Sequence, residues 1–168
     1  MNNYFLKDEW KIIEDGFRPE MHEASESIFS LGNGRMGHRA NFEEKYSGKS
    51  LQGTYLAGVY YPDKTRVGWW KNGYPEYFAK VLNAPNWIGI YVEIDGMELD
   101  LATSKITNFR RELDMKQACL KRTFHAELPN GRAVEVTVSR FLSIVNDEIG
   151  TIRYSVKALN FSGTIHFT

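Results

Sequence analysis

Residues 124–138 read FHAELPNGRAVEVTV, and this stretch predicts two neighbouring strands and the turn between them. Apolar side chains fall on even positions on both sides of the central Pro-Asn-Gly, which is the period of a strand with one buried face. A two-residue Asn-Gly loop would pair Glu127 with Val134 and mix the two faces. A three-residue loop over 129–131 pairs Ala126 with Val134 and keeps the apolar residues together. Proline suits the first turn position and glycine the left-handed position, so we predict a type I turn with a G1 bulge.

The same two-residue alternation recurs on both sides of this hairpin. Asp95-Gly96 offers a tight hairpin turn, and residues 160–163 (Asn-Phe-Ser-Gly) turn the chain again. Short strands at this spacing, with no convincing helical period, indicate an all-β antiparallel sandwich. Because the chain stops inside an alternating pattern, we expect it to be an incomplete N-terminal portion of that sandwich. The further strands are expected near residues 88–94, 99–101, 109–113, 152–158 and 165–167.

Composition narrows the class of protein. The chain has 168 residues, 42% hydrophobic and 25% charged, which is typical of one globular domain or part of one. Lys plus Arg and Asp plus Glu both number 21, so no basic excess favours a nucleic acid partner. No run of apolar residues is long enough for a membrane span, and the N-terminus does not resemble a secretory signal. With Cys119 as the single cysteine, no internal disulfide can form, and we expect a cytoplasmic protein.

Residues 32–37 read GNGRMG and match the G-x-G-x-x-G dinucleotide fingerprint. That fingerprint requires a helix directly after the glycines, because the helix N-terminus holds the pyrophosphate. Residues 38–42 carry no helical apolar stripe, and residues 57–59 (Ala-Gly-Val) stand where an acidic ribose partner is needed. The segment therefore predicts a turn, in which glycine permits a positive φ or a close backbone approach.

Acids and histidines do not assemble into a recognisable catalytic or metal site. Glu43 and Glu44 are adjacent, so in a strand they would face opposite ways and could not flank one glycosidic bond. The four acids between residues 93 and 100 are more typical of a solvated hairpin edge. We therefore expect no catalytic, cofactor-binding or metal-binding residue in this chain. The histidines, none of which lies within five residues of another, are His22, His38, His125 and His166.

Aromatic residues are concentrated between residues 55 and 87. Exposed Trp and Tyr rings can pack on the C–H faces of sugars, which would make the stretch a carbohydrate-binding surface. The alternative is that the rings bury a long loop against the sandwich or another domain. The sequence leaves both open and favours the second.

Five blocks together resemble glycoside hydrolase family 65. Residues 26–40 resemble its opening E-S-x-F motif with N-G-x-x-G, and residues 82–87 (LNAPNW) its L-x-N-x-P-N-W block. One departure is the turn at residues 115–119 (MKQAC), where the family usually carries glycine. The insert at 61–75 is most similar to the maltose phosphorylase branch of the family. The other blocks that resemble the family are residues 53–60, 110–122 and 140–143.

This resemblance implies a fold and a parent enzyme. Family members begin with a super-sandwich of the galactose mutarotase-like type, then have a helical linker and an (α/α)6 barrel. Residues 1–168 would be the N-terminal β-sandwich domain, truncated before the linker and barrel. The barrel holds the catalytic acid and the phosphate site, and phosphate, a co-substrate and not a cofactor, attacks with inversion. The chain alone would then be inactive. The parent's partners would be an α-glucoside disaccharide (maltose, or alternatively trehalose or kojibiose) and a second subunit in a homodimer, and this domain's partner would be the parent's own barrel.

The resemblance also suggests which side chains lie near the parent's active site. We expect Trp69, Trp70, Lys71 and Tyr74 to lie at the substrate rim. The alternative is that the aromatic loop at 55–87 acts as a carbohydrate-binding module in its own right.

Overall fold

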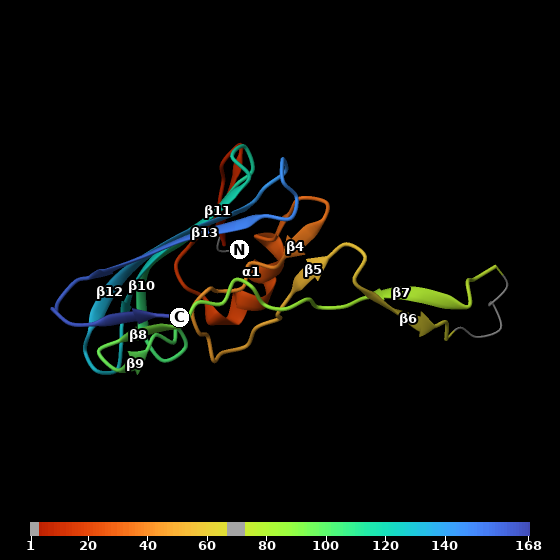
Figure 1. Ribbon diagram of the computed structural model, residues 1–168. Coiled ribbons are helices and arrows are strands. Elements are labelled where there is room, and N and C mark those ends of the chain that lie inside the picture. Colours follow the sequence, from red (N-terminus) through yellow and green to blue (C-terminus); the bar gives the residue numbers. More distant parts are fainter. Residues whose placement is uncertain (1–3, 67–72) are drawn as a thin grey trace.

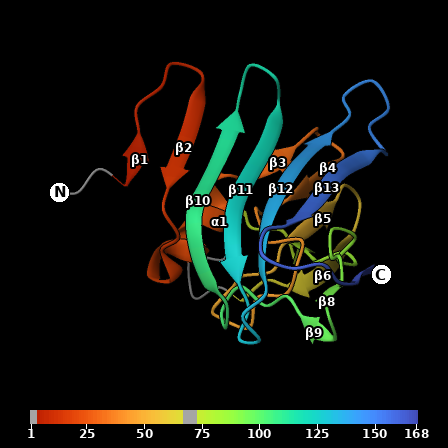
Figure 2. The same ribbon diagram turned by 90° about the vertical axis from the view of Figure 1, so that its left-hand side faces the viewer.

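The molecule is built on one six-stranded antiparallel sheet. The computed structural model describes residues 4–66 and 73–168. Figure 2 shows the sheet face-on, with strand order β1-β2-β10-β11-β12-β13. Four of these strands form a meander of sequence neighbours, and the N-terminal β1 and β2 add to its β10 edge. The bounds are β1 Phe5–Leu6, β2 Lys11–Asp15, β10 Lys105–Asp114, β11 Cys119–Glu127, β12 Ala133–Leu142 and β13 Gly150–Ala158.

Three smaller sheets and one short helix complete the described residues. Behind the six-stranded sheet lie a helix, α1, and the sheets β3-β4-β5 and β14-β8-β9, and a separate two-stranded arm, β6-β7, projects from the body (Figures 1 and 2). The all-β antiparallel prediction is confirmed. The bounds are α1 His22–Ile28, β3 Leu31–Gly32, β4 Met36–His38, β5 Thr54–Leu56, β6 Tyr60–Lys64, β7 Tyr77–Val81, β8 Val92–Ile94, β9 Met97–Glu98 and β14 Ile165–Phe167, with a 3-10 turn at Pro19–Met21.

The turn between β11 and β12 has the geometry that the sequence predicts. Ala126 pairs with Val134. The Gly131 N–H donates to the Leu128 carbonyl at 2.8 Å, and Gly131 has a φ of 78°. These are the hydrogen bond of a type I turn and the left-handed residue of a G1 bulge. The Asp95-Gly96 turn is confirmed as well, because Ile94 pairs with Met97 across it.

The strand expected over 88–94 is shorter than predicted. Only Val92–Ile94 is a strand, although Ile88 is fully buried. The reason is that the N–H of Ile90 donates to the carbonyl of Glu43, outside any ladder. The alternating apolar residues of this segment are therefore a sign of burial and not of a strand, because side chains on irregular backbone can also be buried.

Helix α1 was not predicted from the sequence, and its buried face explains why. The residues that it buries are His22, Ser25 and Glu26, all of them polar. A helix that turns polar side chains inward shows no apolar stripe of period 3.6, which is the signal that a sequence search relies on. Phe29, completely buried, follows the helix and anchors it to the sheet.

Two apolar clusters cover the inner face of the six-stranded sheet, and charge lies between them. Phe109 and Phe124 belong to the larger cluster, whereas Leu113 and Leu120 belong to the smaller one. Along β10 and β11 the inner-face residues between these pairs are Arg111 and Arg122, and the next strand adds Arg140. All three arginines are at most 4% exposed. We call these three arginines the arginine layer.

Carboxylates from strand β2 and from the irregular segment that carries Glu43 and Glu44 neutralise the arginine layer. Arg122 donates to Glu43 Oε2 at 2.5 Å and to Glu44 Oε2 at 2.7 Å. Arg140 Nη1 lies 2.8 Å from Glu43 Oε1, and Arg111 Nε lies 3.4 Å from Glu14 Oε2. The prediction that Glu43 and Glu44 face opposite ways is wrong, because these residues are not in a strand and both reach the same guanidinium.

The pKa values of two arginines of the layer shift in opposite directions, because burial and the nearby carboxylates act against each other. Burial alone would lower the pKa of Arg122, but the carboxylates of Glu44 and Glu43 outweigh burial and raise it. Burial lowers the pKa of Arg111 to about 10, and Glu14 offsets this only in part. Arg111 is therefore still a cation at neutral pH.

The turn between β10 and β11 places alanine where glycine is favoured. Ala118 has a φ of 51°. A left-handed conformation costs a residue with a Cβ roughly 1 kcal/mol. Ala118→Gly should therefore raise the free energy of unfolding by about 0.5–1 kcal/mol, measured by urea denaturation.

Ala102→Gly is the matched control. Ala102 is also exposed and in a turn, but it does not have a positive φ. At that position the substitution should lower stability, because glycine relieves no strain in the folded state and only raises the conformational entropy of the unfolded chain. Equal effects at the two positions would contradict strain at Ala118.

Candidate functional site

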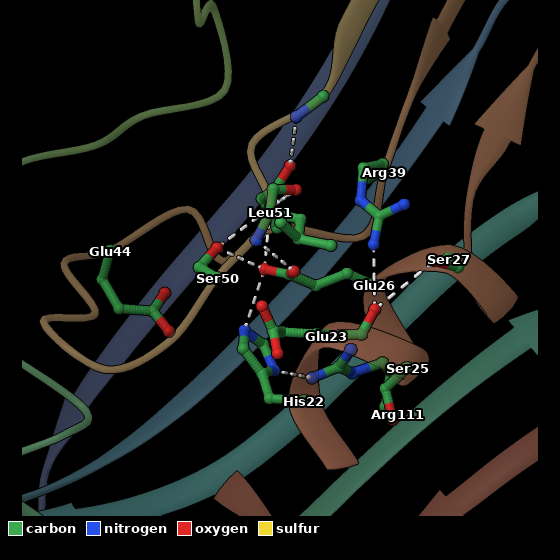
Figure 3. Close-up of polar contacts among 12 residues, drawn as sticks. His22, Glu23, Ser25, Glu26, Ser27, Arg39, Glu44, Ser50, Leu51 and Arg111 are labelled. Carbon is green, nitrogen blue, oxygen red and sulfur yellow. Dashed lines mark hydrogen bonds and ion pairs between the residues drawn. The ribbon is translucent and has the colours of Figure 1, made fainter. Parts of the chain in front are cut away.

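Glu26 is a buried acid with several hydrogen-bond donors around it (Figure 3). Its carboxylate accepts from the Leu51 N–H at 2.8 Å, from Asn41 Nδ2 at 2.7 Å and from the Ser50 hydroxyl. His22 Nε2 lies 3.0 Å from the same carboxylate. Burial alone would raise the pKa of Glu26, but these contacts lower it to about 2. A catalytic acid needs a pKa near the working pH, so Glu26 is a structural hub.

The two buried histidines are held neutral. His22 stacks on Phe42 with ring centroids 4.2 Å apart, and burial lowers its pKa. Burial and the nearby Arg140 lower the pKa of His38 to about 4. In residues 4–66 and 73–168, no group of three His, Cys, Asp or Glu side chains is arranged to hold a metal ion. The same part of the chain contains no helix with the length and apolar content needed to cross a membrane.

The GNGRMG segment forms the β3–β4 hairpin, with no helix after it. Gly34, with a φ of 92°, is the glycine that the turn requires. Asn33 is the residue that the sequence analysis missed. Its Nδ2 donates to the carbonyls of Ser143 at 2.7 Å and Asp147 at 3.0 Å, while its Oδ1 accepts from the Met36 N–H at 2.7 Å. Asn33 thus ties the hairpin to the loop between β12 and β13.

Three of the family-like blocks meet at one open cleft. It has a volume of about 690 Å³ and lies between the β3–β4 hairpin, β5 and the β12–β13 loop. Trp87 and Leu56 supply apolar surface, and an ion pair of 2.7 Å between Arg35 and Glu148 stands at its edge. Val59, which also lines the cleft, leads directly into the arm.

The β6-β7 arm extends from this cleft away from the body (Figure 1). The two strands pair from Tyr60 opposite Val81 to Lys64 opposite Tyr77. One face is largely apolar, because the register puts Tyr60, Tyr77 and Val81 on the same side, each at least 52% exposed. The opposite face carries Lys80 and Asp63, paired at 2.8 Å.

The predicted rim residues belong to the far end of this arm. Trp69, Trp70 and Lys71 lie outside the described residues. Tyr74 is half exposed and packs edge-on against Phe78, with ring centroids 6.3 Å apart. In the described part, the aromatic residues of the arm are therefore presented outward and are not buried against the sandwich, whereas their burial against another domain stays a prediction.

Known proteins resemble the chain over nearly its whole length. It is 49% identical to the maltose phosphorylase of Bacillus subtilis (strain 168) over 161 residues, which cover 96% of this chain and 21% of the relative. It is 35% identical to the α,α-trehalose phosphorylase of Thermoanaerobacter brockii over 95% of this chain and 21% of that relative. The chain thus spans about a fifth of the length of these relatives.

A solved structure and a family model agree with these similarities. The structure of a kojibiose phosphorylase from the human microbiome superposes with a TM-score of 0.80 at 33% identity, covering 92% of this chain and 20% of that one. The model described as "Glycosyl hydrolase family 65, N-terminal domain" matches residues 12–168. The chain therefore belongs to glycoside hydrolase family 65, as its N-terminal domain.

Proposed function

We propose that this chain is the non-catalytic N-terminal domain of an inverting disaccharide phosphorylase whose substrate is maltose. The parent reaction would convert maltose and phosphate into glucose and β-glucose 1-phosphate. The observation that carries the choice of maltose is the 49% identity to a maltose phosphorylase, against 35% to a trehalose phosphorylase. Trehalose and kojibiose remain the alternative disaccharides.

The chemistry of the buried acids supports a non-catalytic role. An inverting enzyme needs a general acid near the glycosidic oxygen and room for the attacking group on the other side. Glu43 and Glu44 are at most 4% exposed and neutralise Arg122, while Glu26 orders the 41–51 segment. Each of these acids already has a structural task that a reacting sugar would disrupt.

We assign the β6-β7 arm the task of reaching the rim of the parent's active site. A two-stranded hairpin on its own is marginally stable in water, so an outward apolar face such as that of Tyr60, Tyr77 and Val81 requires a covering surface. The covering surface in this proposal is the parent's own catalytic barrel. Trp69, Trp70, Lys71 and Tyr74 would then lie at the substrate entrance.

The wider setting of the proposal follows from the same parent. We place the enzyme in the cytoplasm as a homodimer, with inorganic phosphate as a co-substrate and no organic cofactor. The net charge of zero is consistent with a partner other than nucleic acid.

A carbohydrate-binding module is the second candidate function. The specific observation in its favour is the exposure of aromatic rings on the arm, with Tyr61 at 57% and Tyr74 at 50%. Exposed tyrosine and tryptophan rings can stack on sugars. This module would hold carbohydrate without help from a barrel.

The purified 168-residue chain should form no glucose 1-phosphate from maltose and phosphate, whereas the full-length parent should. Calorimetry of the chain with maltose and with glucose separates the two candidates. Absence of heat supports the scaffold, and saturable heat supports the binding module. Phosphorolysis by the chain alone would disprove the non-catalytic assignment.

Rim placement predicts a substrate effect from the arm in the full-length enzyme. Tyr74→Ala and Trp70→Ala should each raise the KM for maltose about fivefold, since a lost aromatic contact is worth about 1 kcal/mol. Tyr74→Phe keeps the ring and should behave like the unaltered enzyme. Trp10→Ala, at another exposed aromatic in a β1–β2 connection remote from the arm, should leave KM unchanged. Unchanged KM in both arm variants would rule out the rim placement.

A scaffold held by Glu26 should lose stability in acid. The pKa of Glu26 falls from an ordinary 4.5 to about 2 on folding. Above pH 4.5 the carboxylate is ionised in both states, so its contribution, about 3 kcal/mol, is complete there and is lost as the pH falls toward 2. His38, whose pKa falls from 6.5 to about 4, adds an earlier loss between those two pH values, because the unfolded chain takes up the proton first.

Urea denaturation at a series of pH values measures this loss. Glu26→Gln should lower stability near neutral pH and flatten the dependence below pH 4.5. Glu148→Gln, at an exposed ion pair with Arg35, should leave the profile as it is. A profile that Glu26→Gln leaves equally steep would show that another group is responsible.

A further inference from the structure

A small buried cavity lies within the arginine layer. Its volume is about 10 Å³, and every residue that lines it is at most 6% exposed. It lies behind β10, β11 and β12, where the segment that carries Glu43 crosses them. The lining residues are Ala40, Asn41, Glu43, Arg111, Leu120, Arg122, Val138 and Arg140.

Two of the lining arginines have N–H groups without a hydrogen-bond partner among the described residues. These groups are Nε and Nη1 of Arg111 and Nε of Arg140. Arg111 Nε forms an ion pair with Glu14 Oε2 at 3.4 Å but no hydrogen bond. Both arginine side chains are only 1% exposed. A buried N–H that makes no hydrogen bond destabilises the folded protein, and more so when the group is charged. Such donors are expected to have an acceptor.

We infer that the cavity binds one ordered water molecule, held by Arg111 and Arg140. A single water needs roughly 10–15 Å³ and two to four polar partners. The cavity meets the lower end of that volume, and the two guanidinium groups supply donors. Glu43 and the carbonyl of Asn41 are acceptors on the same wall, to which the water can donate.

Charge favours water over a monatomic anion at this position. Arg111, Arg122 and Arg140 carry three positive charges. Glu14, Glu43 and Glu44 carry three negative charges at short range. The layer is therefore neutral without an added ion, and an anion would lie beside the carboxylate of Glu43, which also lines the cavity. Water both accepts and donates hydrogen bonds, so it suits a cavity lined by both donor and acceptor groups.

The water would be a structural link between parts of the chain that are far apart in sequence. Arg111 lies on β10, Arg140 on β12, and Asn41 and Glu43 on the crossing segment. Arg140 reaches the Asn41 carbonyl only at 3.3 and 3.4 Å, the long end of hydrogen bonding. A bridging water completes this contact between the segment and the sheet.

A crystal structure at high resolution, from crystals grown with bromide in place of chloride, tests the site directly. We expect one density peak without anomalous signal, about 2.7–3.2 Å from Arg111 Nη1 and Arg140 Nε. An anomalous bromide peak would identify an anion site and overturn the inference. A cavity without density would overturn it as well.

A matched pair of variants tests the polar character of the cavity in solution. Ala40, in the smaller apolar cluster, also lines the cavity, whereas Ala126 lies in the larger apolar cluster and does not line the cavity, and both are at most 2% exposed. Ala40→Ser adds a hydroxyl that can take the place of the water, so its Tm should stay within about 2 °C of the parent. Ala126→Ser buries the same hydroxyl among apolar side chains and should lower the Tm by about 5 °C or more. Equal losses in the two variants would show that the cavity has no donors to satisfy.

Discussion

The contact of Arg122 with Glu43 and Glu44 is the constraint on which the rest of the structure depends. A guanidinium at the centre of the sheet's inner face must be paired, because removing one partner of a buried ion pair costs about 3–5 kcal/mol. The carboxylates of Glu43 and Glu44 come from irregular backbone, so the segment that carries them must cross behind β11 at the level of Arg122. The position of this segment sets that of Phe42, whose ring centroid lies 4.5 Å from the Arg122 guanidinium carbon. Glu26 holds a later part of the same segment by accepting a hydrogen bond from the Leu51 N–H.

The meander of long strands could be predicted because its signals are local. Alternation over 124–138 and the Pro-Asn-Gly turn sufficed to give the pairing of Ala126 with Val134. Helix α1 and the arginine layer could not be predicted in the same way. Their buried side chains are polar, and the groups that satisfy them lie far along the chain, as with Glu44 and Arg122, 78 residues apart. A sequence pattern indicates which apolar residues are buried but does not indicate which charged residues pair over long distances in the chain.

In the candidate site, too, features with a local sequence signal could be predicted and features that depend on long-range contacts could not. The reading of GNGRMG as a turn rested on the missing helix after it, a local signal, and the β3–β4 hairpin confirms it. The role of Asn33 depends on carbonyls at Ser143 and Asp147, which no local pattern connects to it. For the aromatic stretch, carbohydrate binding and burial of the loop both stayed open, because ring content alone does not show which way a hairpin points. The register of β6 and β7 is what places Tyr60, Tyr77 and Val81 on one face and the Lys80–Asp63 ion pair on the other.

The arrangement of the meander also has a consequence for the order of folding. β10 to β13 contact their sequence neighbours, so they can form before the N-terminal third closes its long loops onto them. Until then the three guanidiniums of the arginine layer remain hydrated on an otherwise apolar face. A half-formed sheet of this kind is discouraged from closing on another apolar surface, because that would strand three cations out of water. If the meander forms first, the same charges that pair in the finished core would discourage misassembly of the incomplete sheet.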